Sequence, residues 1–221
     1  MLPNQRAVEI ISRAKQKNVA QPRKSIRDFE NVIADFLAGP LARPVRGQRV
    51  LDLGPGQFDF ARLLQAQGAM VESLDYDPAV IELGGYLGCT VRRADFKDLA
   101  ADELAQRYDG VFCKFSINAF WWNDPTVAYE RQRGFCSLVK PSGWGWIAPW
   151  NGRGERDDAT VACFVDVQNR AFRESGWQRW DLSEELASRY GITGSVLDHP
   201  VFLIGVTPPA LWTARGAARS F

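Results

Sequence analysis

The sequence predicts an α/β fold in which strands and helices alternate along the chain. A short apolar run at 49–53 ends in a glycine-rich turn and passes directly into an amphipathic helix. Further short runs rich in apolar and β-branched residues then alternate with helical stretches as far as residue 206. With 46% hydrophobic and 24% charged residues among 221, the chain is long enough for one such domain and a modest extension.

Composition narrows the class of protein. The 27 Lys and Arg residues nearly balance the 26 Asp and Glu residues, which argues against a dedicated nucleic-acid-binding protein. No apolar run is long enough to cross a membrane, and the first residues lack the hydrophobic stretch of a secretory signal. The cysteines are far apart in the sequence: Cys89, Cys113, Cys136 and Cys163. We therefore expect reduced thiols, a cytoplasmic protein and no membrane partner.

Residues 1–47 are predicted to form a helical extension of the same domain, which itself spans 48–221. The extension holds nine Lys and Arg residues and four acids. Ser25 and Asp28 resemble a capping box, apolar residues recur at helical spacing over 26–37, and Gly39–Pro40 would stop the helix. This helix either packs on the domain edge with a solvated basic face or acts as a lid or an attractor for an acidic substrate.

The glycine turn at 54–56 carries the first functional signal. Gly54 and Gly56 permit unusual dihedral angles and let a ligand approach the main chain closely. The N–H groups that open the following helix attract a carboxylate or a phosphate. In a dinucleotide-binding Gly-x-Gly-x-x-Gly pattern the last glycine would fall on Asp59, whose charge would repel a pyrophosphate. The sequence therefore disfavours NAD.

The next segments repeat the strand–helix alternation. A second strand at 70–75 ends in Asp75, and Asp77–Pro78 then provides an N-cap and a first helical residue. We expect further strands at 89–93, 109–116, 144–149, 177–182 and 201–206, with helices from Asp124–Pro125 to about 139 and over 158–175, and a turn at 140–143.

These residues resemble the class I S-adenosylmethionine-dependent methyltransferases. Asp52-Leu53-Gly54-Pro55-Gly56 matches the first motif of that family, an acid followed by Gly-x-Gly-x-Gly, although Phe58 stands where the third glycine is usual. Asp109 and the Lys140–Gly143 turn are also typical of the family. The resemblance covers 48–206. It implies a three-layer, doubly wound, seven-stranded and mostly parallel sheet whose last strand is antiparallel.

The resemblance also implies a cofactor, S-adenosyl-L-methionine, and the residues that hold it. Asp75 would accept the ribose hydroxyls, Asp95 would receive the adenine amino group, and Phe96 would line the base pocket. Lys114, a cation near a sulfonium, either points away or meets an anionic substrate group. The expected cofactor-binding residues are Asp52, Gly54, Pro55, Gly56, Asp75, Tyr76, Asp95, Phe96 and Lys114.

Candidates for catalysis and acceptor binding follow the later strands. His199, the single histidine, precedes the last strand and is either a general base or a surface residue before Pro200. Asn118 follows the fourth strand, where it contacts substrate or cofactor, or caps a turn. Trp121, Trp122 and Trp150 suit an aromatic wall for the acceptor, whereas Trp146 suits the core.

Three functions remain open on this sequence. The first is metal-independent methyl transfer to an oxygen or nitrogen of a small molecule or glycan unit, since the metal-binding acids of catechol-type enzymes are missing. The second is an RNA or protein methyltransferase that uses the basic N-terminal segment, although the near-neutral net charge of the chain argues against a nucleic-acid partner. The third is a non-catalytic cofactor-binding regulatory subunit, which a pocket narrowed by Phe58 would suit.

Overall fold

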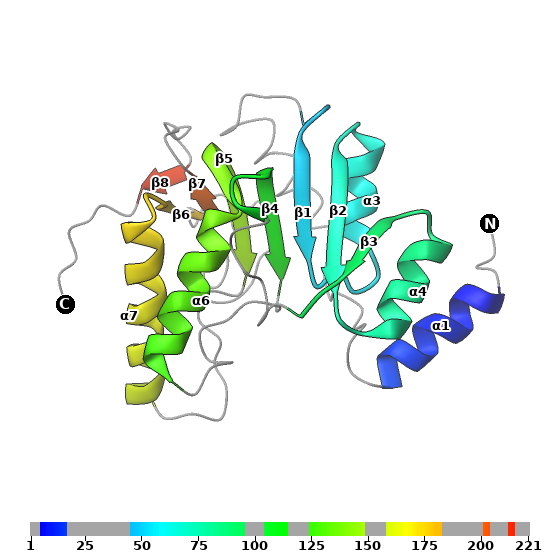
Figure 1. The fold of residues 1–221 in the computed structure, drawn as a ribbon, viewed down its shortest axis with the longest axis horizontal. Coiled ribbons are helices and arrows are strands. Elements are labelled where there is room, and N and C mark those ends of the chain that lie inside the picture. The colour runs from blue at the N-terminus through cyan, green and yellow to red at the C-terminus, as the bar shows by residue number, and fades with distance from the viewer. Residues whose placement is uncertain are drawn as a thin grey trace.

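The computed structural model describes residues 5–16, 45–95, 104–114, 124–148, 158–182, 201–203 and 212–214. Within these ranges the chain forms one sheet with helices packed against it (Figure 1). The strands are β1 (Arg49–Leu53), β2 (Met70–Asp75), β3 (Thr90–Arg93), β4 (Tyr108–Lys114), β5 (Val139–Ala148), β6 (Gln178–Leu182), β7 (Val201–Leu203) and β8 (Trp212–Ala214). The helices are α1 (Gln5–Gln16), α3 (Asp59–Ala66), α4 (Pro78–Tyr86), α6 (Pro125–Ser137) and α7 (Asp158–Glu174).

The sheet has the topology of a doubly wound fold. Its strand order is β3-β2-β1-β4-β5-β7-β6-β8. Strands β1 to β5 pair in parallel, and β7 pairs antiparallel with both β5 and β6. The mostly parallel sheet and its antiparallel β7 are confirmed. Strand β8, three residues antiparallel to β6, adds an eighth strand that the sequence analysis did not predict.

One predicted turn lies inside a strand. Residues 140–143 were expected to precede the fifth strand, but β5 starts at Val139, which pairs with Tyr108, and pairing resumes only at Gly110 and Trp144. This irregularity admits extra residues into β5. The Asp109 carboxylate fixes it by accepting hydrogen bonds from Lys140 Nζ and from the Arg49 N–H, both at 2.8 Å.

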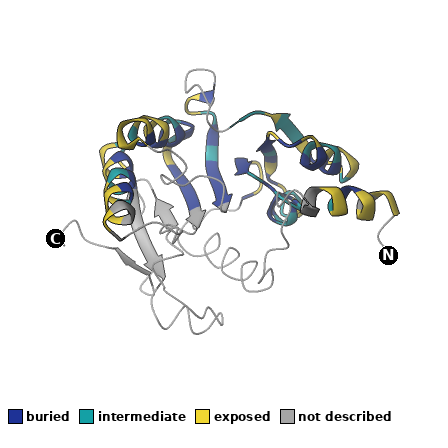
Figure 2. Ribbon diagram, turned by 90° about the horizontal axis from the view of Figure 1, so that it is seen from below, coloured by how far each residue is buried: buried dark blue, intermediate teal, exposed yellow. Residues whose placement is uncertain are grey.

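Alternation along the strands separates two hydrophobic cores, one on each face of the sheet. The α3-side core includes Val50, Phe58, Leu64, Val71, Val80, Leu83 and Phe112. The α6-side core includes Leu51, Leu53, Leu74, Val111, Phe135, Phe172 and Trp177. Figure 2 shows the buried residues along the strands and the inward faces of the helices, with the outward faces exposed. Trp146 is buried in the α3-side core, as the sequence indicated.

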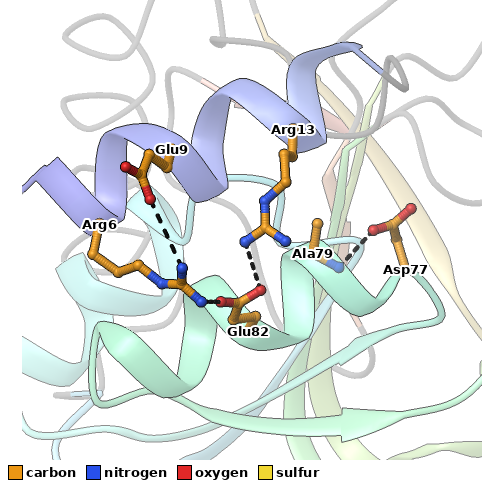
Figure 3. A network of polar contacts seen from close by, with 6 residues as sticks. All are labelled: Arg6, Glu9, Arg13, Asp77, Ala79 and Glu82. Carbon is orange, nitrogen blue, oxygen red and sulfur yellow. Dashed lines mark hydrogen bonds and ion pairs between the residues drawn. The ribbon is translucent and has the colours of Figure 1, made fainter.

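Helix α1 packs against α4. Ile10 is buried in the α3-side core, and Arg6 and Arg13 both form ion pairs with Glu82 of α4 (Figure 3). The sequence predicted a helical extension but centred it on 26–37, which lies outside the described residues. None of the helices in the described ranges has the length and apolar character needed to span a membrane.

Two adjacent glycines of α4 provide a test of this packing. A Cβ atom on Gly84 would lie 2.2 Å from Val91 Cγ2 and 2.6 Å from Phe58 Cζ, whereas Gly85 has nothing within 4 Å of its Cβ position. We expect Gly84→Ala to lower the free energy of unfolding by about 1–3 kcal/mol through overpacking. Gly85→Ala, the matched control, should raise it by up to about 1 kcal/mol. Urea denaturation of both variants measures the difference, and equal effects would contradict the packing.

Candidate functional site

The turn between β1 and α3 exposes the main chain. Gly54 and Gly56 have φ angles of 64° and 58°, in the left-handed region that favours glycine. The Gly54 N–H donates to the Leu74 carbonyl at 2.9 Å, so the turn is tied to β2. A Cβ atom on Gly56 would meet nothing within 4 Å. The backbone at Gly56 is therefore open to a ligand, next to the start of a helix.

Phe58 explains how α3 begins without a third glycine. Its φ of 63° is left-handed, and its N–H donates to the Pro55 carbonyl at 2.9 Å. The side chain is fully buried in the α3-side core, where its ring lies close to Gly84. The ring therefore fills the space between α3 and α4. The regulatory-subunit hypothesis was supported by the idea that Phe58 narrows the cofactor pocket. Because the Phe58 ring lies in the core, the hypothesis loses this support.

The start of α3 also packs against strand β4 of the sheet. Phe60, in the first turn of the helix, stacks on Phe112 of β4 with ring centroids 3.6 Å apart. Phe112 is the register partner of Asp52 on the neighbouring strand. The stacked rings thus anchor the helix start over the sheet beside Asp52.

Three carboxylates predicted from the sequence lie at the carboxyl ends of adjacent parallel strands. Asp52 is the fourth residue of β1, Asp75 is the last residue of β2, and Asp95 follows the end of β3 by two residues. These strands are neighbours in the order β3-β2-β1. The Ala94 N–H donates to the Asp75 carbonyl at 3.0 Å and joins the Asp95 segment to β2. All three acids therefore share one edge of the sheet with the glycine turn, where ligands bind in folds of this kind.

Asp75 has an unusual electrostatic environment. The residue is only 4% exposed, and burial raises the pKa of its carboxyl from 3.8 to about 6. The N–H groups of Asp77 and Tyr76 oppose this rise in pKa, and Asp77 donates to Asp75 Oδ1 at 2.9 Å. The fold thus keeps the Asp75 carboxylate, a hydrogen-bond acceptor, at the strand end, although burial deprives this carboxylate of water. Raised pKa values of this kind are typical of functional sites.

Asp77 and Tyr76 complete the loop after β2. The Asp77 side chain accepts the Ala79 N–H at 2.7 Å and caps α4, with Pro78 as the first helical residue, as the sequence predicted (Figure 3). Tyr76, between two buried acids, is 52% exposed. Tyr76 is therefore accessible to solvent at this edge of the sheet.

The other predicted site residues are not all described. Pro55 is buried within the glycine turn, and Lys114 is the last residue of β4. Those outside the described residues are Phe96, Asn118, Trp121, Trp122, Trp150 and His199. Among the described residues, no group of three His, Cys, Asp or Glu side chains is placed to hold a metal ion.

One residue near the site was missed by the sequence analysis. Ser73 is 1% exposed and lies beside Asp52 in the register of β1 and β2. The available signal was its polarity at a strand position that shares the face of Val71, where the neighbouring side chains belong to the α3-side core.

Comparison with known proteins identifies the fold. No protein-family model and no curated protein matches the chain. A TehB-like S-adenosylmethionine-dependent methyltransferase from Corynebacterium glutamicum matches with TM-score 0.58 and 18% identity, over 90% of this chain and 98% of that chain. Similar enzymes from Mesorhizobium loti (TM-score 0.54, 17% identity, 79% and 98% covered) and Archaeoglobus fulgidus (0.51, 15%, 80% and 94%) also match. The chain therefore has the Rossmann-like fold of the class I S-adenosylmethionine-dependent methyltransferases.

Proposed function

We propose that the protein is a methyltransferase that uses S-adenosylmethionine to methylate an oxygen or nitrogen of a small molecule or glycan unit. The observation that carries the proposal is that the open main chain at Gly56 and the buried Asp75 carboxylate lie at the same edge of the sheet. When bound, the cofactor supplies an electrophilic methyl group on its sulfonium. We place the reaction in the cytoplasm, with no metal ion.

The described residues fit such a cofactor. A buried carboxylate at the end of β2 accepts hydroxyl donors, as Asp75 would from the two ribose hydroxyls. The turn at Gly54–Gly56 lets the carboxylate end of an amino acid approach the N-terminus of α3. The buried carboxylate of Asp52 favours a cation nearby, and Asp95 is within the segment tied to β2. Alignment of a nucleophile with the methyl group would then supply most of the rate enhancement.

Calorimetric titration tests the cofactor directly. We expect S-adenosylmethionine to bind with one site per chain and NAD not to bind, because Asp59 occupies the first turn of α3. Release of S-adenosylhomocysteine with hydroxyl-bearing and amine-bearing acceptors, followed by mass spectrometry of the product, then tests the transfer. Binding of NAD in place of S-adenosylmethionine would reject the proposal.

His199 is proposed to remove a proton from the acceptor, with Asn118 contacting the reacting groups and Trp121, Trp122 and Trp150 forming a wall for the acceptor. We expect His199→Ala to lower kcat by about 10²- to 10⁴-fold, the usual contribution of a general base, without changing the affinity for the cofactor. Steady-state kinetics with an acceptor identified in the experiment above measure this change in kcat. Full activity in His199→Ala would leave His199 a surface residue.

The alternative of an RNA or protein substrate held by the basic N-terminal segment loses support from α1. Arg6 and Arg13, two of its cations, are paired with Glu82 on the protein itself (Figure 3). A small-molecule acceptor requires no such basic arm. Salt-dependent RNA binding by the full chain would restore the alternative.

A further inference from the structure

Ser73 of β2 carries a hydroxyl that is buried in the protein. It lies in β2, two residues before Asp75, and is 1% exposed. Its Oγ atom has no hydrogen-bond partner in the part of the chain that the structure describes. Burying a polar group without a partner is unfavourable, and native proteins keep few such groups. A function in ligand binding, and not in the packing of the free protein, would explain why the Ser73 hydroxyl is buried without a partner among the described residues.

The side chain that this hydroxyl can reach is Asp52. The two residues are register partners on adjacent parallel strands. Val50 and Val71, two residues earlier on each strand, both belong to the α3-side core. Because side chains alternate between the faces of a strand, Asp52 and Ser73 project from this same face.

The spacing of the strands allows a hydrogen bond between them. Adjacent strands lie about 4.8 Å apart, and a Ser Oγ and an Asp carboxylate together span that gap. Ser73 has three staggered χ1 rotamers, so one rotation redirects its Oγ along the sheet. Its register partner on the other side, Val91 of β3, is apolar and packs on the α3-side core. Of these two flanking partners, Asp52 alone carries an acceptor.

We propose that Ser73 is a positioning residue for Asp52. When a cationic group of bound S-adenosylmethionine draws the Asp52 carboxylate toward the glycine turn, the Ser73 hydroxyl donates a hydrogen bond to that carboxylate and fixes its orientation. Both residues are buried, so this charge-assisted bond forms in a medium of low dielectric, where it is strong. The inference rests on the proposed function, in which Asp52 contacts the cofactor.

Titration calorimetry of the full chain with S-adenosylmethionine tests the pairing through a double-mutant cycle. We expect Ser73→Ala to weaken binding by about tenfold or more, the loss typical of a hydrogen bond to a charged group. In the Asp52→Ala background, which has no side-chain acceptor for the Ser73 hydroxyl, the same substitution should change the affinity by less than about twofold. The melting temperature of free Ser73→Ala should equal or exceed that of the wild type, because the variant loses an unpartnered hydroxyl.

The possible results separate the inference from the proposed function. Unchanged affinity in Ser73→Ala, or an equal loss in both backgrounds, would overturn the positioning role and leave the proposed function intact. Absence of binding by the wild type would reject the proposed function and the inference with it. Should Asp52→Ala bind the cofactor too weakly to measure, the variant Ser73→Cys provides the deciding measurement. It nearly keeps the size of serine but donates weakly, so it should bind as poorly as Ser73→Ala, and wild-type affinity would contradict the inference.

Discussion

Asp75→Asn is expected to weaken cofactor binding strongly while making the free protein more stable. The asparagine keeps the shape of the side chain and can still accept the Asp77 N–H, which now donates to Asp75 Oδ1 at 2.9 Å. It cannot offer a charged acceptor to the ribose hydroxyls. Replacing two charge-assisted hydrogen bonds by neutral ones costs about 2–3 kcal/mol, or roughly 30- to 150-fold in the dissociation constant. Calorimetric titration with S-adenosylmethionine measures this loss.

The gain in stability follows from the raised pKa of Asp75. A carboxyl whose pKa is about 6 in the folded protein and 3.8 in the unfolded chain binds its proton more tightly in the folded state. Its contribution to stability is therefore fully present below pH 3.8 and is lost as the pH rises through about 6. The loss above that pH is at most about 3 kcal/mol. Asp75→Asn should recover much of it at pH 7.5 and none at pH 3.5, as urea denaturation at the two pH values would measure.

The same pKa sets a pH dependence for binding in the wild type. Below pH 6 the Asp75 carboxyl is increasingly protonated and loses its charge, so the affinity for the cofactor should fall as the pH decreases from 7 to 5. In Asp75→Asn this part of the pH dependence should disappear. Asp77→Asn is the matched control, because Asn caps a helix as well as Asp does and the substitution lies two residues away. Equal affinities of Asp75→Asn and the wild type would remove Asp75 from the site.

Gly56→Val is expected to abolish binding while the protein remains folded. The added side chain would meet nothing in the protein within 4 Å of its Cβ and would occupy the space above the turn. A β-branched residue at a φ of 58° also introduces backbone strain of about 1–3 kcal/mol. The circular dichroism spectrum should be retained, and titration with S-adenosylmethionine should give no detectable heat of binding.

Gly47→Val separates the loss of binding from the strain. Gly47 also has a left-handed φ, 79°, and nothing within 4 Å of its Cβ position, but it precedes the amino end of β1. Both variants should lose similar stability, and only Gly56→Val should lose binding. If Gly47→Val binds as weakly as Gly56→Val, the effect comes from strain, and the open turn has no role in binding.

The elements that the sequence predicted best are those determined by local signals. β1 and β2 match their predicted bounds because an apolar run is bounded by a glycine turn or an acid, and Asp77–Pro78 fixes the start of α4. The three acids at one edge were predicted from the family resemblance, together with the rule that carboxyl ends of parallel strands meet at one edge of a sheet.

Elements that depend on tertiary contacts could not be predicted in the same way. α1 is held by Ile10 in the core and by two arginines on Glu82, about seventy residues away in the sequence. β8 has only three residues and exists through its pairing with β6. Phe58 adopts a left-handed conformation that favours glycine because its ring fills the core beside Gly84. In each case a distant partner outweighs the local preference.

A crystal structure of the protein with S-adenosylhomocysteine tests the central claim most directly. We predict that the ribose hydroxyls donate to the Asp75 carboxylate, that the amino-acid end passes over Gly56, and that Asp52 and Asp95 flank the same ligand. A ligand bound elsewhere, with Asp75 in contact only with the N–H groups of its own loop, would contradict the account.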